Sequence, residues 1–166
     1  MSIRLIQSLW RDCEGSEFIE ASILLPVMLV LFYGVFEFSW YFYNQQLAMT
    51  GVRDAARYLA RASTSETTNP CTDSSLVRNA QNLAATGTIS NGGGPRVKGW
   101  TYQGVSITCP AYTNNVGTIY QGGATIYLIT VSTNFADPAL GLLRSLGIIG
   151  TLGISVSHSE RHIGPG

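Results

Sequence analysis

Charge is scarce in this sequence, and so are the residues that usually do chemistry. The 166 residues include only ten basic and ten acidic side chains, which together make up 12% of the chain. A balanced and sparse charge provides no basic surface to hold a phosphate backbone. Nucleic-acid binding is therefore excluded as a function class. Residues 63–134 are rich in Thr, Ser, Asn and Gly, which is the polarity expected of a solvated exterior domain.

Catalytic and metal-binding patterns are equally thin. The two histidines, His158 and His162, lie near the end of the chain with no G-x-S-x-G sequence to accompany them, and we expect a strand-end and a solvated tail residue. They form an H-x3-H pair without cysteines at zinc-site spacing. Glu66, Asp73 and Asp137 are too scattered to form a calcium loop. We therefore predict no enzymatic activity, no cofactor and no metal.

Cysteine is represented by three residues. Cys13 precedes the apolar run rather than following it, which is the reverse of the order in a lipoprotein signal. Cys71 and Cys109 lie in the polar region, where an oxidising exterior would allow them to pair. Closing that loop would contribute on the order of 3–4 kcal/mol in the chain-entropy model. The alternative is two unpaired thiols in a core.

One long apolar run is present. Residues 21–43 contain Glu37 as their only formal charge, and about 20 apolar residues suffice to span a bilayer. A cleaved secretory signal would have a shorter apolar region, of about 7–15 residues. Aromatic residues crowd the far end of the run, as in an interfacial belt. The flanking arginines favour neither orientation, but the cysteines place the C-terminal domain outside and the N-terminus in the cytoplasm.

The helical pattern continues beyond the span. Apolar residues recur at helical spacing up to Ala60, so one helix is predicted from about Glu17 to Arg61, with an apolar stripe on its second half. Pro26 should bend or loosen this helix, and Gly51 marks a second weak point. The stripe consists of Leu47, Val52, Ala55, Ala56, Leu59 and Ala60.

The remainder predicts a small mixed domain. A loop over 63–72 precedes a helix over 74–86, with Asp73 as its N-cap and Gly87 as its stop. A flexible loop is expected over 90–95, since no Lys-Ser/Thr follows its three glycines to make a phosphate site.

Strand patterns follow within 97–109, 118–133 and 151–159. In the last strand Leu152, Ile154, Val156 and His158 share one face. The apolar segment 137–150 reads as a short helix or hairpin element packed on the sheet, or one that meets the membrane or a neighbouring subunit. The fold class is α+β: a long N-terminal transmembrane helix continuing into a small domain with an antiparallel β-sheet, as in pilins.

The stretch "GSEFIEASILLPVMLVLFYGVFEFSWYFYNQQLAMTGVRDAARYLA" resembles the N-terminal segment of TadE-like proteins, the minor pilins or pseudopilins of Tad (Flp, type IVc) pilus systems. It covers residues 15–60, and the part near the C-terminus agrees more loosely. The matching motifs are Ile19-Glu20-Ala21, Leu25-Pro26, Glu37-Phe38, Tyr43, Gln45-Gln46 and Ala55-Ala56-Arg57-Tyr58.

The resemblance implies processing by a prepilin peptidase between Gly15 and Ser16. Residues 1–15 would be a cytoplasmic leader that carries Cys13 away, residues 16–62 the long helix, and residues 63–166 the exterior domain. Major Flp pilins have Tyr after the processing glutamate, whereas this chain has Ala21, which fits an accessory subunit.

Glu20 would be the fifth mature residue, about 6 Å along the helix from the new Ser16 ammonium. A neighbouring subunit shifted by that rise would pair its ammonium with this carboxylate in lipid, which makes Glu20 a candidate assembly residue. The alternative is that Glu20 and Glu17 are acids at the membrane surface. Glu37 is the second candidate, and its alternative is to reach the outer headgroups.

The resemblance also implies partners and a location. The expected partners are other pilin and pseudopilin subunits, the prepilin peptidase, the inner-membrane pilus assembly platform and membrane lipid. The expected place is the bacterial inner membrane, crossed once, with the C-terminal domain periplasmic and entry into an extracellular pilus as a further option. Two other readings are open: a periplasmic binding or sensor protein anchored by an uncleaved helix, and a secreted enzyme, for which no catalytic cluster is found.

Overall fold

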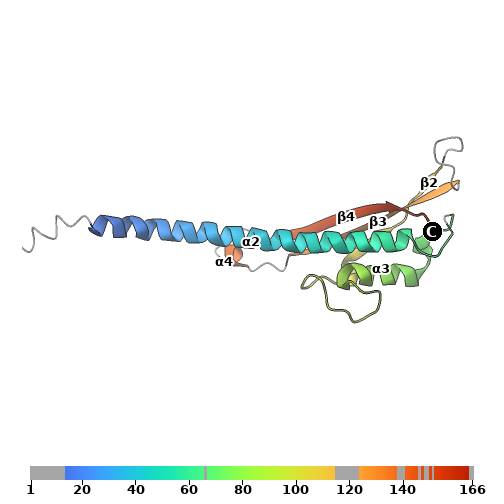
Figure 1. The fold of residues 1–166 in the computed structure, drawn as a ribbon, viewed down its shortest axis with the longest axis horizontal. Coiled ribbons are helices and arrows are strands. Elements are labelled where there is room, and N and C mark those ends of the chain that lie inside the picture. Colours follow the sequence, from blue (N-terminus) through green and yellow to red (C-terminus); the bar gives the residue numbers. More distant parts are fainter. Residues whose placement is uncertain are drawn as a thin grey trace, which may run out of the picture.

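The computed structural model describes residues 14–65, 67–114, 124–137, 141–145, 147, 150 and 152–164. One long helix runs the length of the molecule, and the other elements gather around its second half (Figure 1). In chain order the elements are α2 (Glu14–Ala60), η1 (Pro70–Thr72), α3 (Ser74–Thr86), η2 (Tyr102–Gly104), β1 (Val105–Thr108), β2 (Ala111–Thr113), β3 (Thr125–Ala136), α4 (Leu142–Ser145) and β4 (Gly153–Arg161). The predicted α+β class is confirmed.

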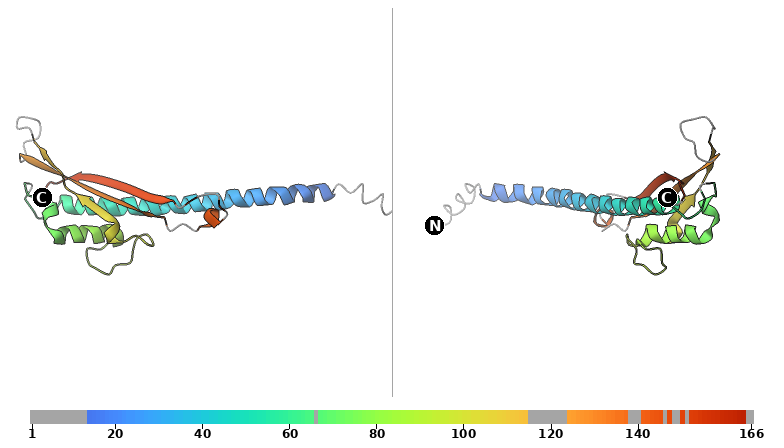
Figure 2. Two further views of the ribbon diagram at one scale, coloured as in Figure 1. Left: turned by 180° about the vertical axis from the view of Figure 1, so that it is seen from behind. Right: turned by 45° about the vertical axis from the view of Figure 1, so that its right-hand side comes forward.

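Helix α2 has 47 residues and therefore extends about 70 Å. Its bounds agree with the predicted helix within three residues, and it contains Pro26 in its interior. The start of α2 projects away from the other described elements, and α4 lies beside its middle, whereas β3 and β4 lie along one side of the second half and α3 along another (Figure 2). The single helix thus links a bare rod to a packed domain.

The sheet is centred on β3, which pairs with each of the other three strands in antiparallel fashion. β4 pairs with it from Leu128↔Arg161 to Ala136↔Gly153. On the opposite edge β1 and β2 follow one another, separated by Cys109 and Pro110. Pro110 has no N–H to donate to a ladder, and its carbonyl instead accepts from the Leu128 amide at 3.0 Å.

The core lies between α2, α3 and the sheet. The predicted stripe faces it, because Val52, Ala55, Ala56 and Leu59 are all fully buried. From the sheet come Ile129, Val131, Ile154 and Val156, at the alternate positions that a strand presents to one face.

Gly51 is the position where α2 and α3 meet most closely. A Cβ there would fall on the Ala84 carbonyl oxygen and lie 2.9 Å from Cη2 of Trp100. This residue, expected to be a weak point, is instead the place where only glycine permits the packing.

Helix α3 begins and ends where the sequence predicts. The Asp73 carboxylate accepts from the amides of Ser75 and Leu76, which leaves fewer unsatisfied donors in the first turn. These hydrogen bonds, with that from the Ser75 hydroxyl, lower the pKa of Asp73. At the other end Gly87 adopts φ 79°, the left-handed conformation that favours glycine.

The strand predicted within 97–109 is only partly correct. Residues 97–104 form turns and the short helix η2, and the strand begins at Val105. Gly99 has φ +85°, which a strand does not use, and Val97 and Trp100 are both buried at a spacing of three. The alternation of side chains was misleading because Trp100 belongs to the core between layers rather than to a sheet face.

The other predicted segments agree with the structure to different extents. The last strand has its predicted face, with Ile154 and Val156 buried and Ser155 and Ser157 exposed. The second strand pattern starts later than expected, at Thr125, and residues 115–123 lie outside the described part. Within 137–150 the structure describes one turn of helix, α4, and the side chains of Leu140, Leu142, Leu143, Leu146, Ile148 and Ile149 lie outside the description.

Candidate functional site

The first half of α2 presents an apolar surface. Within the part of the chain that the structure describes, α2 is the one helix long and apolar enough to cross a membrane. Nearly every side chain from Glu17 to Tyr43 is exposed, with Phe18 at 77% and Val35 at 66%. A contiguous apolar surface of this size on a protein marks contact with lipid or another protein.

The processing and assembly residues lie at the start of this surface. The bond between Gly15 and Ser16 is within the first turn of α2, and the side chains of these two residues are outside the description. Glu17 and Glu20 are exposed and lie within one turn of each other. Both carboxylates are therefore open to a partner, and the predicted roles of Gly15, Ser16 and Glu20 stay predictions.

Glu37 lies in different surroundings from those expected of a residue that reaches the headgroups. Its side chain is 1% exposed, and one carboxylate oxygen accepts from the Gly141 amide at 3.1 Å. Gly34 and Tyr41, which flank it on the same helix face, are half-buried. The segment that includes α4 passes over this face and is seen beside α2, away from the sheet (Figure 1). The chain thus covers the one carboxylate of its own apolar run at residues 21–43.

A second buried acid lies near the first. Asp137 is 8% exposed, and its Oδ1 accepts from the Asn44 side-chain amide at 3.1 Å. Its Oδ2 is buried without a hydrogen-bond partner in the described part of the chain. Burial raises the pKa of Asp137, and the charge of Glu37 adds to that rise, whereas the Asn44 hydrogen bond opposes it.

Sequence reasoning missed this pair. Asp137 looked like one of three scattered acids because Glu37 is 100 residues away in the chain. A signal was present: Asn44 is a polar residue on the face that carries Ala48 and Val52, at spacings of four and eight. A polar residue on a buried face needs a partner, and Asp137 is that partner.

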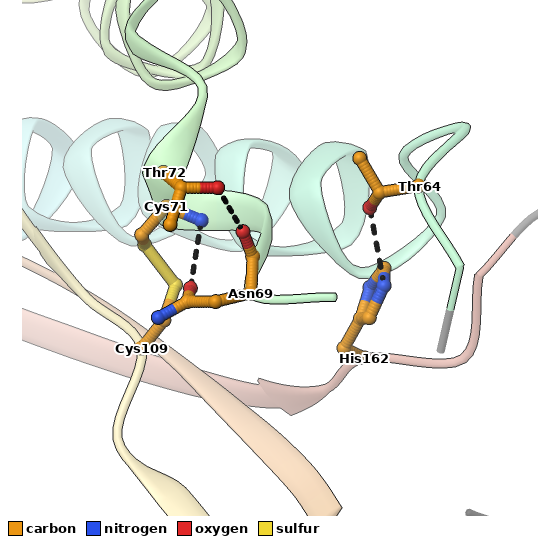
Figure 3. The surroundings of a disulfide bond; sticks show 6 residues. All are labelled: Thr64, Asn69, Cys71, Thr72, Cys109 and His162. Carbon is orange, nitrogen blue, oxygen red and sulfur yellow. Dashed lines mark hydrogen bonds between the residues drawn. A yellow bond between two sulfur atoms is a disulfide. The ribbon is translucent and has the colours of Figure 1, made fainter. Parts of the chain in front are cut away.

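The prediction of a solvated tail for His162 is wrong. The residue is 3% exposed, with Nδ1 at 3.2 Å from the Ala60 carbonyl and Nε2 at 3.2 Å from the Ser65 carbonyl and 3.3 Å from the Thr64 hydroxyl (Figure 3). The next amide, of Ile163, also donates to Ala60, at 3.0 Å. Both groups lie at the carbonyl of Ala60, the last residue of α2, which has no partner within the helix, and this explains the burial.

His158 lies within β4 and forms part of a small charged group. Its Nε2 is 2.9 Å from the Glu160 carboxylate, and Arg57 of α2 is 3.7 Å from the same oxygen. The His158 hydrogen bond is the main cause of a lowered pKa at Glu160. In the described residues no cluster of three or more His, Cys, Asp or Glu side chains could hold a metal ion.

The two cysteines of the packed domain are joined. Cys71 and Cys109 form a disulfide that links η1 to the segment between β1 and β2 (Figure 3). The Asn69 side chain accepts from the Cys71 amide at 2.9 Å and orients this turn. The bond closes the loop that contains α3 and the whole segment that follows it, so it braces the domain across its middle.

Comparison with known proteins gives one family. Residues 15–57 match the family described as TadE-like protein, which confirms the resemblance over most of α2. No curated protein and no solved structure matches the chain at a significant level. The TadE-like segment and the apolar helix together fit a pilin-like protein associated with a Tad pilus, and the helix suggests membrane anchoring.

Proposed function

We propose that this chain is a minor pilin or pseudopilin that supports assembly of a Tad (type IVc) pilus used in adherence. It is a structural subunit rather than an enzyme. It is made in the bacterial inner membrane with its N-terminus cytoplasmic and its disulfide-linked domain outside. The prepilin peptidase removes residues 1–15, and the mature helix then joins other pilin and pseudopilin subunits at the assembly platform.

The observation that carries this proposal is the division of α2. The TadE-like match covers residues 15–57, so it crosses both the bare apolar half and the packed half of one continuous helix. A simple membrane anchor needs about 20 apolar residues and no more. A helix that leaves the span and becomes the core of the exterior domain holds that domain at a fixed place relative to the span, as a subunit that must pack in register requires.

Glu20 has a specific role in this proposal. Cleavage before Ser16 would create an ammonium group one turn away from Glu20, whose side chain is exposed near the start of the helix. Burying an isolated charge in lipid is costly, and pairing between neighbouring subunits removes much of that cost. The pair therefore favours entry of the helix into an assembly of like helices.

N-terminal sequencing tests the processing step. The chain is expressed with and without a prepilin peptidase of a Tad system, and the N-terminus is determined by sequencing and intact mass. We expect Ser16 as the new terminus with the peptidase, and no cleavage in a Gly15→Leu variant. A Met1 terminus that persists with an active peptidase would instead make the chain a membrane-anchored binding or sensor protein.

A matched pair of variants tests the assembly step. Glu20→Gln removes the charge without changing the shape, whereas Glu17→Gln makes the same change at an exposed acid one turn away. We expect the amount of sheared pili to fall at least about tenfold in Glu20→Gln and to stay at the wild-type level in Glu17→Gln. Equal piliation in the two variants would remove Glu20 from the assembly mechanism.

A further inference from the structure

A cavity of about 360 Å³ lies between α3 and the loop that follows it, on the exterior domain. This volume is at the lower end of the range of roughly 300–1,000 Å³ that small-molecule sites occupy. Three lining residues are apolar: Pro95 is exposed, whereas Ala85 and Trp100 are at most 1% exposed and form the closed base of the cavity. Polar groups from α3 and the loop surround that base, which is the usual composition of a site for a small polar ligand.

One side of the cavity is formed by Arg78 and Tyr102, whose side chains stack on each other. The Arg78 guanidinium lies 3.5 Å from the centre of the Tyr102 ring. Such stacking fixes the plane of the guanidinium but leaves its N–H donors free at the edge. Arg78 has no ion pair in the described part of the chain, and none of the described residues that line the cavity is acidic. Its charge is therefore available to a ligand.

One turn along the same face of α3 from Arg78, Asn82 and the loop residue Asn91 offer amide groups. Asn82 is 3% exposed, and its Nδ2 donates to the Asn91 side-chain oxygen at 2.9 Å and to the Ile89 carbonyl at 3.4 Å. Neither Asn82 Oδ1 nor Asn91 Nδ2 has a hydrogen bond to the described residues, so the pair presents one acceptor and one donor group. Adjacent donors and acceptors of this kind match neighbouring hydroxyls, each of which can donate and accept.

Several contacts fix the position of the loop and of the base, and so the shape of the cavity. The Arg96 amide donates to the Ala85 carbonyl at 2.7 Å, and the Arg96 side chain pairs with Asp54 of α2 at 2.7 Å. A Cβ on Gly93 would lie 2.7 Å from the Thr88 hydroxyl, so glycine lets the loop close onto α3. Trp100 donates from Nε1 to Thr133 at 2.9 Å, which fixes the base. A site organised in advance loses less entropy when it binds a ligand.

We propose that this cavity binds an acidic sugar, a pyranose ring that bears a carboxylate. The carboxylate meets the free edge of Arg78, where a planar guanidinium forms two parallel hydrogen bonds. The ring hydroxyls meet the Asn82 and Asn91 amides, and the C–H face of the ring lies on Pro95. Neither the cleavage after Gly15 nor the pilus assembly role is needed for this site.

The test uses the full chain in detergent micelles with three probes: sodium D-glucuronate, D-glucose and sodium acetate. Dissociation constants are measured by ligand-observed nuclear magnetic resonance. We expect glucuronate to bind at least about tenfold more tightly than glucose, because an added charge-assisted hydrogen bond has about that effect. Acetate, which has no ring, is expected to bind more weakly than glucuronate. Glucuronate no tighter than glucose would overturn the proposal, and so would acetate equal to glucuronate.

Two arginine variants separate this site from general charge. Arg78→Gln should reduce the affinity for glucuronate to that for glucose and leave the affinity for glucose unchanged. Arg53→Gln, at an exposed arginine of α2 that does not line the cavity, should leave both affinities unchanged. Equal loss in the two variants would contradict the assignment. If Arg78→Gln does not fold, Arg78→Lys keeps the charge without the planar fork and should still weaken glucuronate binding.

Discussion

The two halves of α2 differ in the size and burial of their side chains, although they are one unbroken helix. From Phe18 to Tyr43 the residues are mostly large, apolar and exposed, whereas from Asn44 to Ala60 the buried face is made mainly of small residues. Small side chains let α3 and the sheet approach the helix closely, whereas large apolar side chains suit contact with lipid. The residue types of α2 therefore change at about residue 44, from large exposed apolar side chains to small ones that pack in the domain.

Replacing one leucine in each half of α2 should give the largest difference in the free energy of unfolding. Leu59 is fully buried, and Leu59→Ala should lower the free energy of unfolding of the exterior domain by about 2–5 kcal/mol through the cavity it leaves. Leu31 is 60% exposed, and Leu31→Ala should change that quantity by less than about 0.5 kcal/mol. Urea unfolding in detergent, followed by circular dichroism, measures both. Similar losses in the two variants would show that the halves are not distinct.

The disulfide should matter to the second half alone. Replacing both Cys71 and Cys109 with Ser opens a loop whose ends are 38 residues apart, at a cost on the order of 3–4 kcal/mol. The helical signal of the first half should persist in micelles under conditions that unfold the rest. Free-thiol labelling of the wild-type chain under non-reducing conditions is the control, and we expect no label on either cysteine.

Replacing one glycine in each half of α2 should give a smaller difference in stability. Gly51→Ala places a methyl group against the Ala84 carbonyl and Trp100, so the exterior domain should lose about 1–3 kcal/mol of stability. At Gly34 a Cβ meets nothing within 4 Å, and Gly34→Ala should be neutral or favour the helix by about 1 kcal/mol. Thermal unfolding of both variants decides this. A tolerated Gly51→Ala would mean that α2 and α3 can separate easily.

The buried pair of Glu37 and Asp137 should give the smallest effect on stability, and this effect should change with pH in a defined direction. Burial holds the folded-state pKa of Asp137 above its ordinary value of 3.8, so the stability linked to this group is present at low pH and is lost as pH rises through the folded pKa. Asp137→Asn removes that loss, and its advantage over the wild type should therefore grow as pH rises from about 4 and then level off.

Asp73→Asn is the matched control. The Ser75 and Leu76 hydrogen bonds hold the pKa of Asp73 below 3.8, so the stability it contributes is present above that value and is lost as pH falls. This variant should lose its disadvantage at low pH, the opposite trend to Asp137→Asn. Unfolding midpoints measured from pH 3 to 7 compare the two, and parallel trends would contradict the assignment of the buried pair.

Local signals in the sequence were sufficient for several elements. The caps of α3, the stripe of α2 and the buried face of β4 depend on residues within a few positions of one another, and each was predicted. The turn before β1 was not, because Trp100 is held by Thr133 and stacks on Phe135, both more than 30 residues away.

The same reason explains what was missed near the candidate site. Glu37 is covered by a segment about 100 residues further along the chain, and His162 is buried by contacts with the end of α2. The sequence shows that both residues are polar and out of place, but not which distant groups they meet. The roles of Gly15, Ser16 and Glu20 were assigned by resemblance and stay predictions, since a cleavage site has no packing pattern of its own.

The contact of His162 and Ile163 with Ala60 has a consequence for the order of events in synthesis. The end of α2 is closed by the residues that follow β4, and β4 itself completes both the sheet and the core. The span at the N-terminus is therefore made more than a hundred residues before the domain can close. The packed domain therefore stays partly formed until β4 and His162 have been synthesised, and until then the edge of β3 is open to pairing with other strands.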